Sequence, residues 1–272
     1  MVEMVEVADP EDPRIADFLH LTDAEFRRRV EAGRGLFVAE SVPVIRRALR
    51  SGHRVRSILA TRKRFEQLAD AVAGDDLVVY VASQEVLNRV VGFNLHRGAV
   101  AMVEREPETA LEPLVAEARL VAVLEGINDL ENLGAIFRSA AGLGVEGVLL
   151  DPTCADPYHR RVVRVSMGAV LQMPFRRLEP WPQALDELRR RGFVVVALTP
   201  AAAAVDLDTV DPPPRTAVVL GAEGPGLSKE VLALADRTVR IRMCGDVDSL
   251  NVGHAAAIAF HHFRGGSGGQ RP

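Results

Sequence analysis

Short apolar runs separated by helical patterns occupy the first hundred residues. Four of these runs predict strands, at residues 35–40, 55–61, 77–83 and 98–104. Apolar residues at helical spacing predict helices between and before them, at 14–33, 41–52, 62–73 and 84–92. Ser41 is the expected N-cap of the second helix and Gly52 its stop. The pattern predicts an α/β unit over residues 1–103, with residues 1–13 loose because two prolines stand there among acidic residues.

A second α/β pattern follows an acidic stretch. Residues 104–117 contain Pro107 and Pro113 and predict a linker. Strands are expected within 120–126, 145–152, 193–200, 216–221 and 238–243, and helices within 132–144, 181–192, 229–237 and 249–263, with a helix and a turn within 157–175. The run at 120–126 is almost continuously apolar, as in a parallel strand buried on both faces. We therefore expect a second domain at 118–264 and, from its glycines, a flexible tail at 265–272.

The composition predicts a soluble globular protein but does not indicate its function. The chain is 48% hydrophobic and 26% charged, as soluble globular domains are. It has no run of about 18 apolar residues that could span a membrane. The N-terminus is acidic rather than basic, unlike a signal peptide, and the two cysteines are far apart in sequence, which favours a reducing, cytoplasmic location.

The distribution of charge is more informative than the net value of -4. The segment from Ser41 to Phe65 contains no acidic residue. Its basic residues are Arg46, Arg47, Arg50, Arg54, Arg56, Arg62, Lys63 and Arg64. Such a face can bind phosphates on a net-acidic protein, although a solvated helix face is an equally good interpretation at this point.

Arg138 is the first candidate for chemistry. It follows a helix start at Asn132, outside the apolar stripe formed by Leu133, Ile136, Phe137, Ala140 and Ala141. On the expected helix it lies beside Gly134, Ala135 and Gly142, and such small residues allow a ligand to approach closely. The alternative is a surface arginine paired with Asp129 or Glu131.

Two glycine-containing turns follow later strands, at the sheet edge where α/β proteins bind ligands. One includes Gly221, Glu223, Gly224 and Gly226 and leads to a helix with Ser228 as the expected N-cap. It has neither the GK[ST] of a phosphate-binding loop nor the GxGxxG spacing, and Glu223 would repel a pyrophosphate, so it suits a cationic ligand. The other turn precedes Ser249, expected as an N-cap, and Asn251, for which the pattern gives no structural role. The histidines and cysteines show no spacing typical of a metal site.

In this order and spacing, the three segments resemble the SpoU (TrmH) family of the SPOUT superfamily, RNA ribose 2'-O-methyltransferases that use S-adenosylmethionine. Asn132 and Arg138 match the first family motif, Gly221, Glu223, Gly224 and Gly226 the second, and Ser249, Leu250, Asn251 and Val252 the third. The resemblance spans residues 118–263, with Gly253 where family members often have serine.

The resemblance implies a division of roles among these residues. It implies catalytic roles for Asn132, Arg138, Glu223, Ser249 and Asn251. It also implies cofactor contacts in the loops, by Leu198, Thr199, Pro200, Leu220, Gly221, Ala222, Gly224, Gly226, Ile241, Met243 and Leu250. No metal is implied.

The resemblance further implies a deep trefoil knot in the second domain, a homodimer, and an RNA-binding first domain like ribosomal protein L30e. The RNA contacts would then be Arg46, Arg47, Arg50, Arg54, Arg62, Lys63, Arg64, Arg160 and Arg161, with ribosomal RNA expected rather than transfer RNA. Alternatives are a tRNA 2'-O-methyltransferase, a non-catalytic RNA-binding or ribosome-assembly protein, and a different nucleotide-binding α/β enzyme such as an oxidoreductase.

Overall fold

The computed structural model describes residues 2–21, 33–73 and 76–264. The expected tail at 265–272 and most of the helix expected at 14–33 lie outside these residues. In the described part of the segment expected to be helical, residues Pro13–Phe18 form a short 3-10 helix, η1, which the Asp12 side chain caps.

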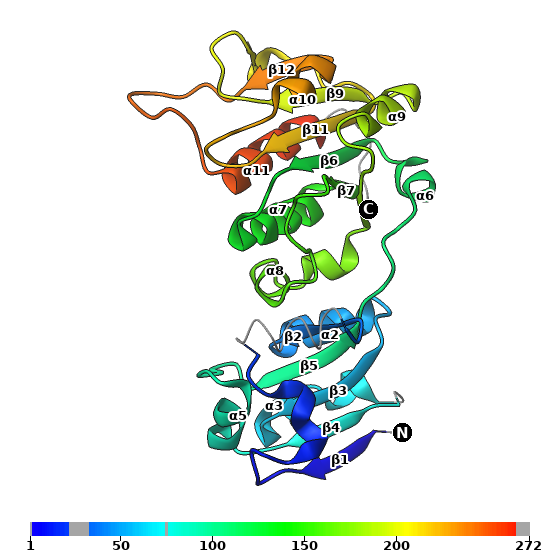
Figure 1. The fold of residues 1–272 in the computed structure, drawn as a ribbon, viewed down its shortest axis with the longest axis vertical. Helices are drawn as coiled ribbons and strands as arrows, with labels where there is room; N and C mark the ends of the chain where they lie inside the picture. Colours follow the sequence, from blue (N-terminus) through cyan, green and yellow to red (C-terminus); the bar gives the residue numbers. More distant parts are fainter. Residues whose placement is uncertain (1, 22–32, 74–75, 265–272) are drawn as a thin grey trace. The chain divides into compact units, whose positions relative to one another are not determined.

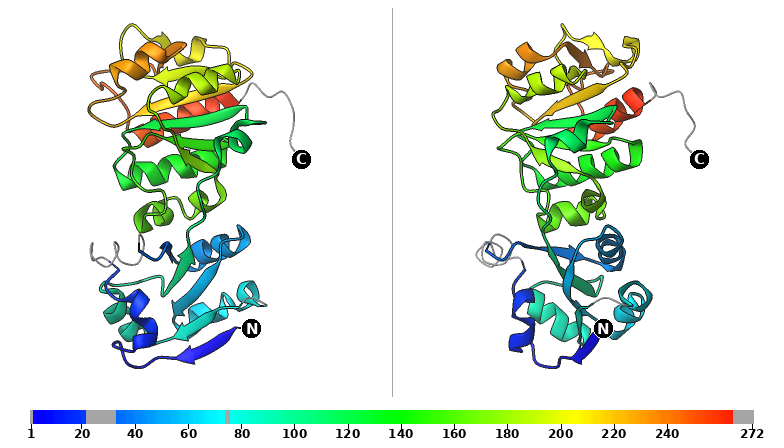
Figure 2. Two further views of the ribbon diagram at one scale, coloured as in Figure 1. Left: turned by 45° about the vertical axis from the view of Figure 1, so that its right-hand side comes forward. Right: turned by 90° about the vertical axis from the view of Figure 1, so that its right-hand side faces the viewer.

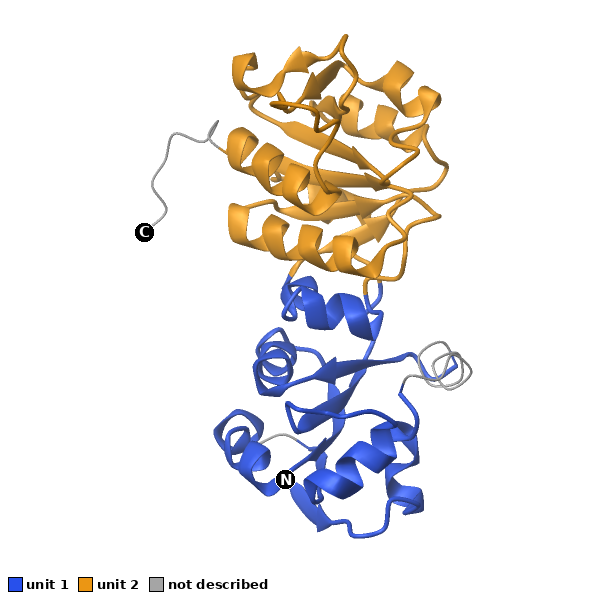
Figure 3. Ribbon diagram, turned by 90° about the vertical axis from the view of Figure 1, so that its left-hand side faces the viewer, with its two compact units in different colours: residues 1–107, 158–172 blue, residues 108–157, 173–272 orange. Residues whose placement is uncertain are grey.

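The chain forms two compact units (Figure 3). Unit 1 comprises Met1–Pro107 and Tyr158–Gln172, and unit 2 comprises Glu108–Pro157 and Met173–Pro272. Two boundaries therefore differ from those expected. Residues 108–117, within the expected linker, belong to unit 2, and residues 158–172, within the expected second domain, belong to unit 1.

The first difference arises because part of the expected linker is packed. Helix α6 (Leu111–Val115) buries Leu114 and Val115 in the core of unit 2. The Leu114 side chain fills the space beside Gly147, where a Cβ would lie 2.4 Å from Leu114 Cδ2. Leu111, Leu114 and Val115 are too few to show a helical period in the sequence.

The second difference arises because residues 158–172 make contacts in unit 1 that the local pattern of hydrophobic residues does not predict. Helix α8 (Arg160–Val165) and the 3-10 helix η3 (Ala169–Gln172) lie in unit 1. The Tyr158 ring stacks on Phe37 with centroids 4.8 Å apart, and Arg160 Nη1 is paired with Glu40 Oε2 at 3.0 Å. Arg47 Nη1 donates to the carbonyl of Met167 at 2.9 Å.

Unit 1 is built on a mixed five-stranded sheet in the order β1-β4-β3-β5-β2 (Figure 1). Its strands are β1 (Glu3–Glu6), β2 (Leu36–Glu40), β3 (Val55–Ala60), β4 (Val78–Val81) and β5 (Ala99–Glu104). Its helices before the linker are α2 (Val42–Arg50), α3 (Arg62–Glu66), α4 (Ala69–Val72) and α5 (Gln84–Val91). The four predicted strands are confirmed. The prediction of a loose N-terminus is wrong for β1, which pairs in parallel with β4 as a largely exposed edge strand and so shows little apolar signal.

Unit 2 contains a seven-stranded parallel sheet in the order β10-β12-β9-β11-β6-β7-β8. Its strands are β6 (Leu120–Glu125), β7 (Gly147–Leu150), β8 (Phe175–Arg177), β9 (Val194–Leu198), β10 (Val205–Asp206), β11 (Thr216–Gly221) and β12 (Arg237–Arg240). Strands β7 and β8 follow β6 on one side of it. The later strands β9 to β12 all lie on its other side, so β6 and β11 flank a topological switch point.

Helices cover both faces of the unit 2 sheet. They are α7 (Leu130–Leu143), α9 (Ala184–Arg190), α10 (Lys229–Leu234) and α11 (Val252–Phe263), with the 3-10 helix η4 (Leu207–Thr209). Helices α7 and α11 lie together on one face (Figure 2), and α6, α9 and α10 contribute to the core on the other. Gly253 allows the close contact of α7 and α11, because a Cβ there would lie 3.1 Å from the Cβ of Ala135.

Candidate active site at the carboxyl edge of the unit 2 sheet

Helix α7 presents Arg138 to solvent. The Asp129 carboxylate caps its N-terminus, accepting from the backbone N–H groups of Glu131 and Asn132 at 3.0 and 2.8 Å. The predicted stripe is buried except for Ala141, which is exposed because the helix face there points away from the sheet. Arg138 makes no hydrogen bond or ion pair with any residue that the structure describes, so the expected alternative of a pair with Asp129 or Glu131 is not observed.

The loop after β11 folds back onto the end of its own strand. A Cβ at Gly221 would lie 2.5 Å from the carbonyl carbon of Gly226, so no side chain fits there. Gly224 and Gly226 have positive φ angles of 87° and 69°, a conformation that favours glycine. Gly226 N donates to Ala222 O at 3.0 Å, and Ser228 caps α10 through Val231 N, as predicted. The glycines therefore shape a compact loop that has no room for a side chain at Gly221 and favours glycine at Gly224 and Gly226.

Glu125 fixes the other end of this loop, and the sequence analysis missed it. Its Oε1 accepts from Trp181 Nε1 at 3.0 Å and from Ser228 Oγ at 2.7 Å, and its Oε2 accepts from Ser228 N at 2.8 Å. One carboxylate thus joins the end of β6, the segment before α9 and the first turn of α10. An acidic residue closing the apolar run of β6 beside Gly126 was the available signal.

Glu125→Gln should loosen this junction. The amide replaces one acceptor oxygen with an N–H₂ group that faces either Trp181 N–H or Ser228 N–H, so two donors oppose each other. We expect the free energy of unfolding to fall by about 1–3 kcal/mol. Trp181 is the single tryptophan of the chain, so its fluorescence emission should shift as well.

Glu179→Gln is the matched control for that experiment. Glu179 is exposed, lies two residues from Trp181 and makes no bond with any described residue. Equal stability and emission in the two variants would contradict the role of Glu125.

Three predicted site residues form one hydrogen-bonded group. Asn251 Nδ2 donates to Asn132 Oδ1 and to Glu223 Oε1, each at 2.7 Å. Glu223 Oε1 also accepts from Val252 N at 3.1 Å. Asn251 Oδ1 caps α11, accepting from Gly253 N at 3.0 Å. Asn251 is therefore the N-cap of α11, and the expectation that Ser249 would have this role is wrong because the helix begins at Val252.

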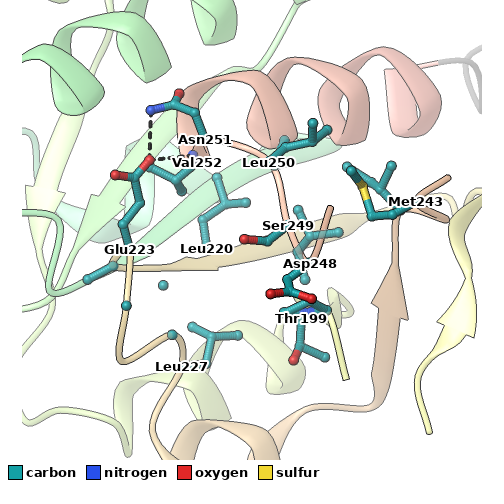
Figure 4. A pocket seen from close by; sticks show the side chains of 18 residues that line it. Thr199, Leu220, Glu223, Leu227, Met243, Asp248, Ser249, Leu250, Asn251 and Val252 are labelled. Carbon is teal, nitrogen blue, oxygen red and sulfur yellow. Dashed lines mark hydrogen bonds between the residues drawn. The ribbon is translucent and has the colours of Figure 1, made fainter. Parts of the chain in front are cut away.

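A pocket of about 550 Å³ lies where these loops meet (Figure 4). All eleven residues expected to contact a cofactor line it, as do Glu223, Ser249 and Asn251. Asn132 does not line the pocket but accepts a hydrogen bond from Asn251, which does. Arg138 does not line the pocket. The sequence analysis missed four lining residues, Leu227, Asp248, Val252 and Ala255.

The charged side chains that line the pocket are all acidic. Glu223 and Asp248 contribute carboxylates, and none of the lining residues is lysine, arginine or histidine. Because like charges repel, this lining disfavours a pyrophosphate and suits a ligand that carries positive charge. The prediction from Glu223 alone is thereby strengthened.

The predicted RNA contacts are less uniform than the sequence suggests. Arg46 pairs with Asp70, Arg62 with Glu6, and Arg54 and Arg56 with Glu104 at 3.3 and 3.8 Å. Arg64 donates to Gln67 Oε1. Arg50 and Lys63 are exposed and have no bonded partner among the described residues, and Arg161 is exposed. Four arginines, Arg46, Arg54, Arg56 and Arg62, are thus paired at the surface of unit 1 with acidic residues outside the segment 41–65.

Arg160 differs from the others because it faces inward. Its ion pair with Glu40 joins side chains that are 18% and 7% exposed, and its guanidinium lies over the Phe93 ring, 4.6 Å from the centroid. A charge paired in this way is expensive to remove from its partner. We therefore assign Arg160 to the packing of unit 1 and omit it from the RNA contacts.

Three further findings concern metal ligands, membrane spans and a thiol in the part of the chain that the structure describes. The described residues contain no group of three or more His, Cys, Asp or Glu side chains that could hold a metal ion. No helix among them is long and apolar enough to cross a membrane. Burial raises the pKa of Cys154 to about 12, so its thiol stays neutral at physiological pH and is not a nucleophile.

The fold and the pocket define a class: a parallel α/β unit that binds its ligand at the carboxyl ends of neighbouring strands. The SpoU rRNA Methylase family model matches residues 119–261, more than half of the chain. The protein belongs to this family, as the three motifs predicted.

Full-length relatives extend the likeness beyond unit 2. An uncharacterized tRNA/rRNA methyltransferase of Mycobacterium tuberculosis is 44% identical over 269 residues, which cover 96% of this chain and 91% of the relative. An AdoMet-bound rRNA methyltransferase from Sinorhizobium meliloti superposes with a TM-score of 0.81 at 27% identity, covering 96% of this chain and 97% of its own. An RNA 2'-O ribose methyltransferase superposes with a TM-score of 0.79 at 28% identity, covering 95% and 97%.

Proposed function

We propose that the protein transfers a methyl group from S-adenosylmethionine to a ribose 2'-hydroxyl of RNA, with ribosomal RNA as the substrate. The observation that carries the proposal is the convergence of three separate segments on one pocket. All the expected cofactor residues line that pocket, and the Asn132–Asn251–Glu223 group stands at its edge. Two solved structures, of an AdoMet-bound rRNA methyltransferase and of an RNA 2'-O ribose methyltransferase, support the same function.

The pocket fits this cofactor in size and charge. Its volume of about 550 Å³ lies in the range of small-molecule sites. Gly221, Gly224 and Gly226 leave backbone groups accessible for the adenosine part, and the carboxylates of Glu223 and Asp248 complement a cationic ligand. When bound, S-adenosylmethionine supplies an electrophilic methyl group on a positively charged sulfur.

Residues at the edge of the pocket carry hydrogen-bonding groups that are available to orient a ribose. Asn132 Oδ1 accepts from Asn251, but its Nδ2 donates to no described group. Glu223 Oε2 and Ser249 Oγ likewise have no bonded partner among the described residues. All the polar atoms of the Asn251 side chain are engaged, so Asn251 positions Asn132, Glu223 and the start of α11.

Arg138 has the electrostatic role in this proposal. A 2'-hydroxyl is a weak nucleophile and must lose or share its proton as it attacks. A guanidinium stays protonated in proteins, so it stabilises the developing alkoxide and grips an RNA phosphate rather than accepting the proton. Because Arg138 is exposed and outside the pocket of its own chain, it meets the ribose at the mouth of the site, from the same chain or from the second subunit of a homodimer.

Unit 1 is the proposed RNA-binding part. Its exposed cations Arg50, Lys63 and Arg161 are the strongest candidates for phosphate contacts. The weaker candidates are already bonded within unit 1: Arg46, Arg47, Arg54, Arg62 and Arg64. The likeness of this unit to L30e, the trefoil knot in unit 2, the homodimer and the cytoplasmic location all remain predictions of the family resemblance.

Methyl transfer to RNA is the direct test. Purified protein with tritiated S-adenosylmethionine and total RNA should label ribosomal RNA, and nuclease digestion should recover the label as a 2'-O-methylnucleoside. Label in transfer RNA would favour the tRNA alternative, and binding without transfer would favour a non-catalytic protein. Thermal stabilisation by NAD or ATP, but not by S-adenosylhomocysteine, would instead indicate a different nucleotide-binding enzyme.

A further inference from the structure

Asp248 is a carboxylate that the motifs do not account for. It lines the pocket from the segment before α11, is exposed, and bonds to no described residue. Glu223, the other lining carboxylate, is partly occupied, because its Oε1 accepts from Asn251 Nδ2 and Val252 N. Asp248 is therefore the pocket carboxylate with both oxygens available for a ligand.

The two carboxylates lie toward different ends of the pocket. In Figure 4, Glu223 and Asn251 stand at one side, and Asp248 at the other, beyond Leu220. Under the proposed function, the reacting sulfonium methyl faces the side with Asn132, Asn251 and Glu223, where the ribose is held. The second positive group of the cofactor, its α-ammonium, is then the one left for Asp248.

We infer that Asp248 binds the α-ammonium group of S-adenosylmethionine and so selects ligands that carry an amino acid end. This inference rests on the proposed function. An ammonium donates up to three hydrogen bonds to oxygen acceptors, and an ionised acceptor strengthens each of them. Because Asp248 is exposed, water screens the pair, and we expect its removal to weaken binding about five- to tenfold.

Calorimetric titration of the wild type, Asp248→Asn and Asp248→Glu tests the inference with three ligands. S-Adenosylmethionine and S-adenosylhomocysteine both carry the ammonium, whereas 5'-methylthioadenosine lacks the whole amino acid end. Asp248→Asn should weaken the first two by the same factor and leave the third unchanged, and Asp248→Glu should restore most of the loss. Asp246→Asn is the matched control, because Asp246 is exposed in the same segment but does not line the pocket, and it should change nothing.

Each other outcome overturns the inference in a distinguishable way. Weaker binding of S-adenosylmethionine alone would place Asp248 against the sulfonium instead. An equal loss for 5'-methylthioadenosine would mean that the substitution disturbs the loop. Unchanged affinities with a wild type that binds normally would refute the contact, and a wild type that binds none of the three ligands would refute the proposed function with it.

Discussion

Arg138→Ala is expected to slow methyl transfer by roughly two to three orders of magnitude while S-adenosylmethionine still binds. The side chain is exposed on α7, does not line the pocket and bonds to no described residue, so its removal leaves both the fold and the cofactor contacts intact. What is lost is the charge opposite the developing alkoxide. Removing one electrostatic stabiliser of a transition state costs about 3–4 kcal/mol, which corresponds to a turnover lower by roughly two to three orders of magnitude.

Single-turnover incorporation of tritiated methyl groups, together with calorimetry, separates the two effects. Arg138→Lys keeps a positive charge without the planar fork and should recover only part of the rate. Arg190→Ala removes an exposed arginine of α9, paired with Glu187, and should leave transfer unchanged. Near-normal turnover in Arg138→Ala would show that the proposed electrostatic role is wrong.

A mixing experiment locates the arginine relative to the pocket that it serves. Subunits with Arg138→Ala retain an intact pocket, and subunits with a disabled pocket retain Arg138. If the arginine acts across a homodimer, mixed dimers regain activity that neither variant has alone. If it acts within its own chain, the mixture stays inactive.

The site was predictable where its features are local in sequence. Glycine spacing in the loop 221–226 and the position of Asn132 at the start of a helix reflect backbone requirements, and these can be read from one chain. The eleven cofactor contacts were implied by the family resemblance rather than by these local features, and all eleven line one pocket. Five of the seven strands that the structure describes in unit 2 were predicted, because an apolar run is also a local feature. The short strands β8 and β10, at the two edges of the sheet, were missed.

Several features that the sequence did not reveal depend on partners that are distant in the chain. Glu125 matters only because Trp181 and Ser228 reach it, and Arg160 is internal only because Glu40 and Phe93 receive it. The assignment of residues 158–172 to unit 1 has the same origin. Asn251 gave no structural signal because a cap is recognised only when the first residue of the helix is known, and α11 begins three residues after Ser249.

Gly221→Ala is expected to weaken S-adenosylmethionine binding strongly, through the protein's own loop rather than through the cofactor. A clash with the ligand is the simpler expectation for a larger side chain at this position. In the structure, however, even a Cβ would lie 2.5 Å from the carbonyl carbon of Gly226 and 2.6 Å from Leu227 N. Backbone atoms cannot move aside cheaply, so the loop 222–227 must shift, and Ala222, Gly224, Gly226 and Leu227 all line the pocket.

We expect a loss of affinity of at least about tenfold and a free energy of unfolding lower by about 1–3 kcal/mol, as for other overpacked sites. Calorimetry and denaturant unfolding measure the two effects. Gly142→Ala is the matched control, because Gly142 lies in α7, a Cβ there meets nothing within 4 Å, and alanine favours a helix. Its affinity should be unchanged and its stability equal or higher. Unaltered binding in Gly221→Ala would mean that the loop after β11 does not shape the cofactor pocket, and the proposed site would have to lie elsewhere.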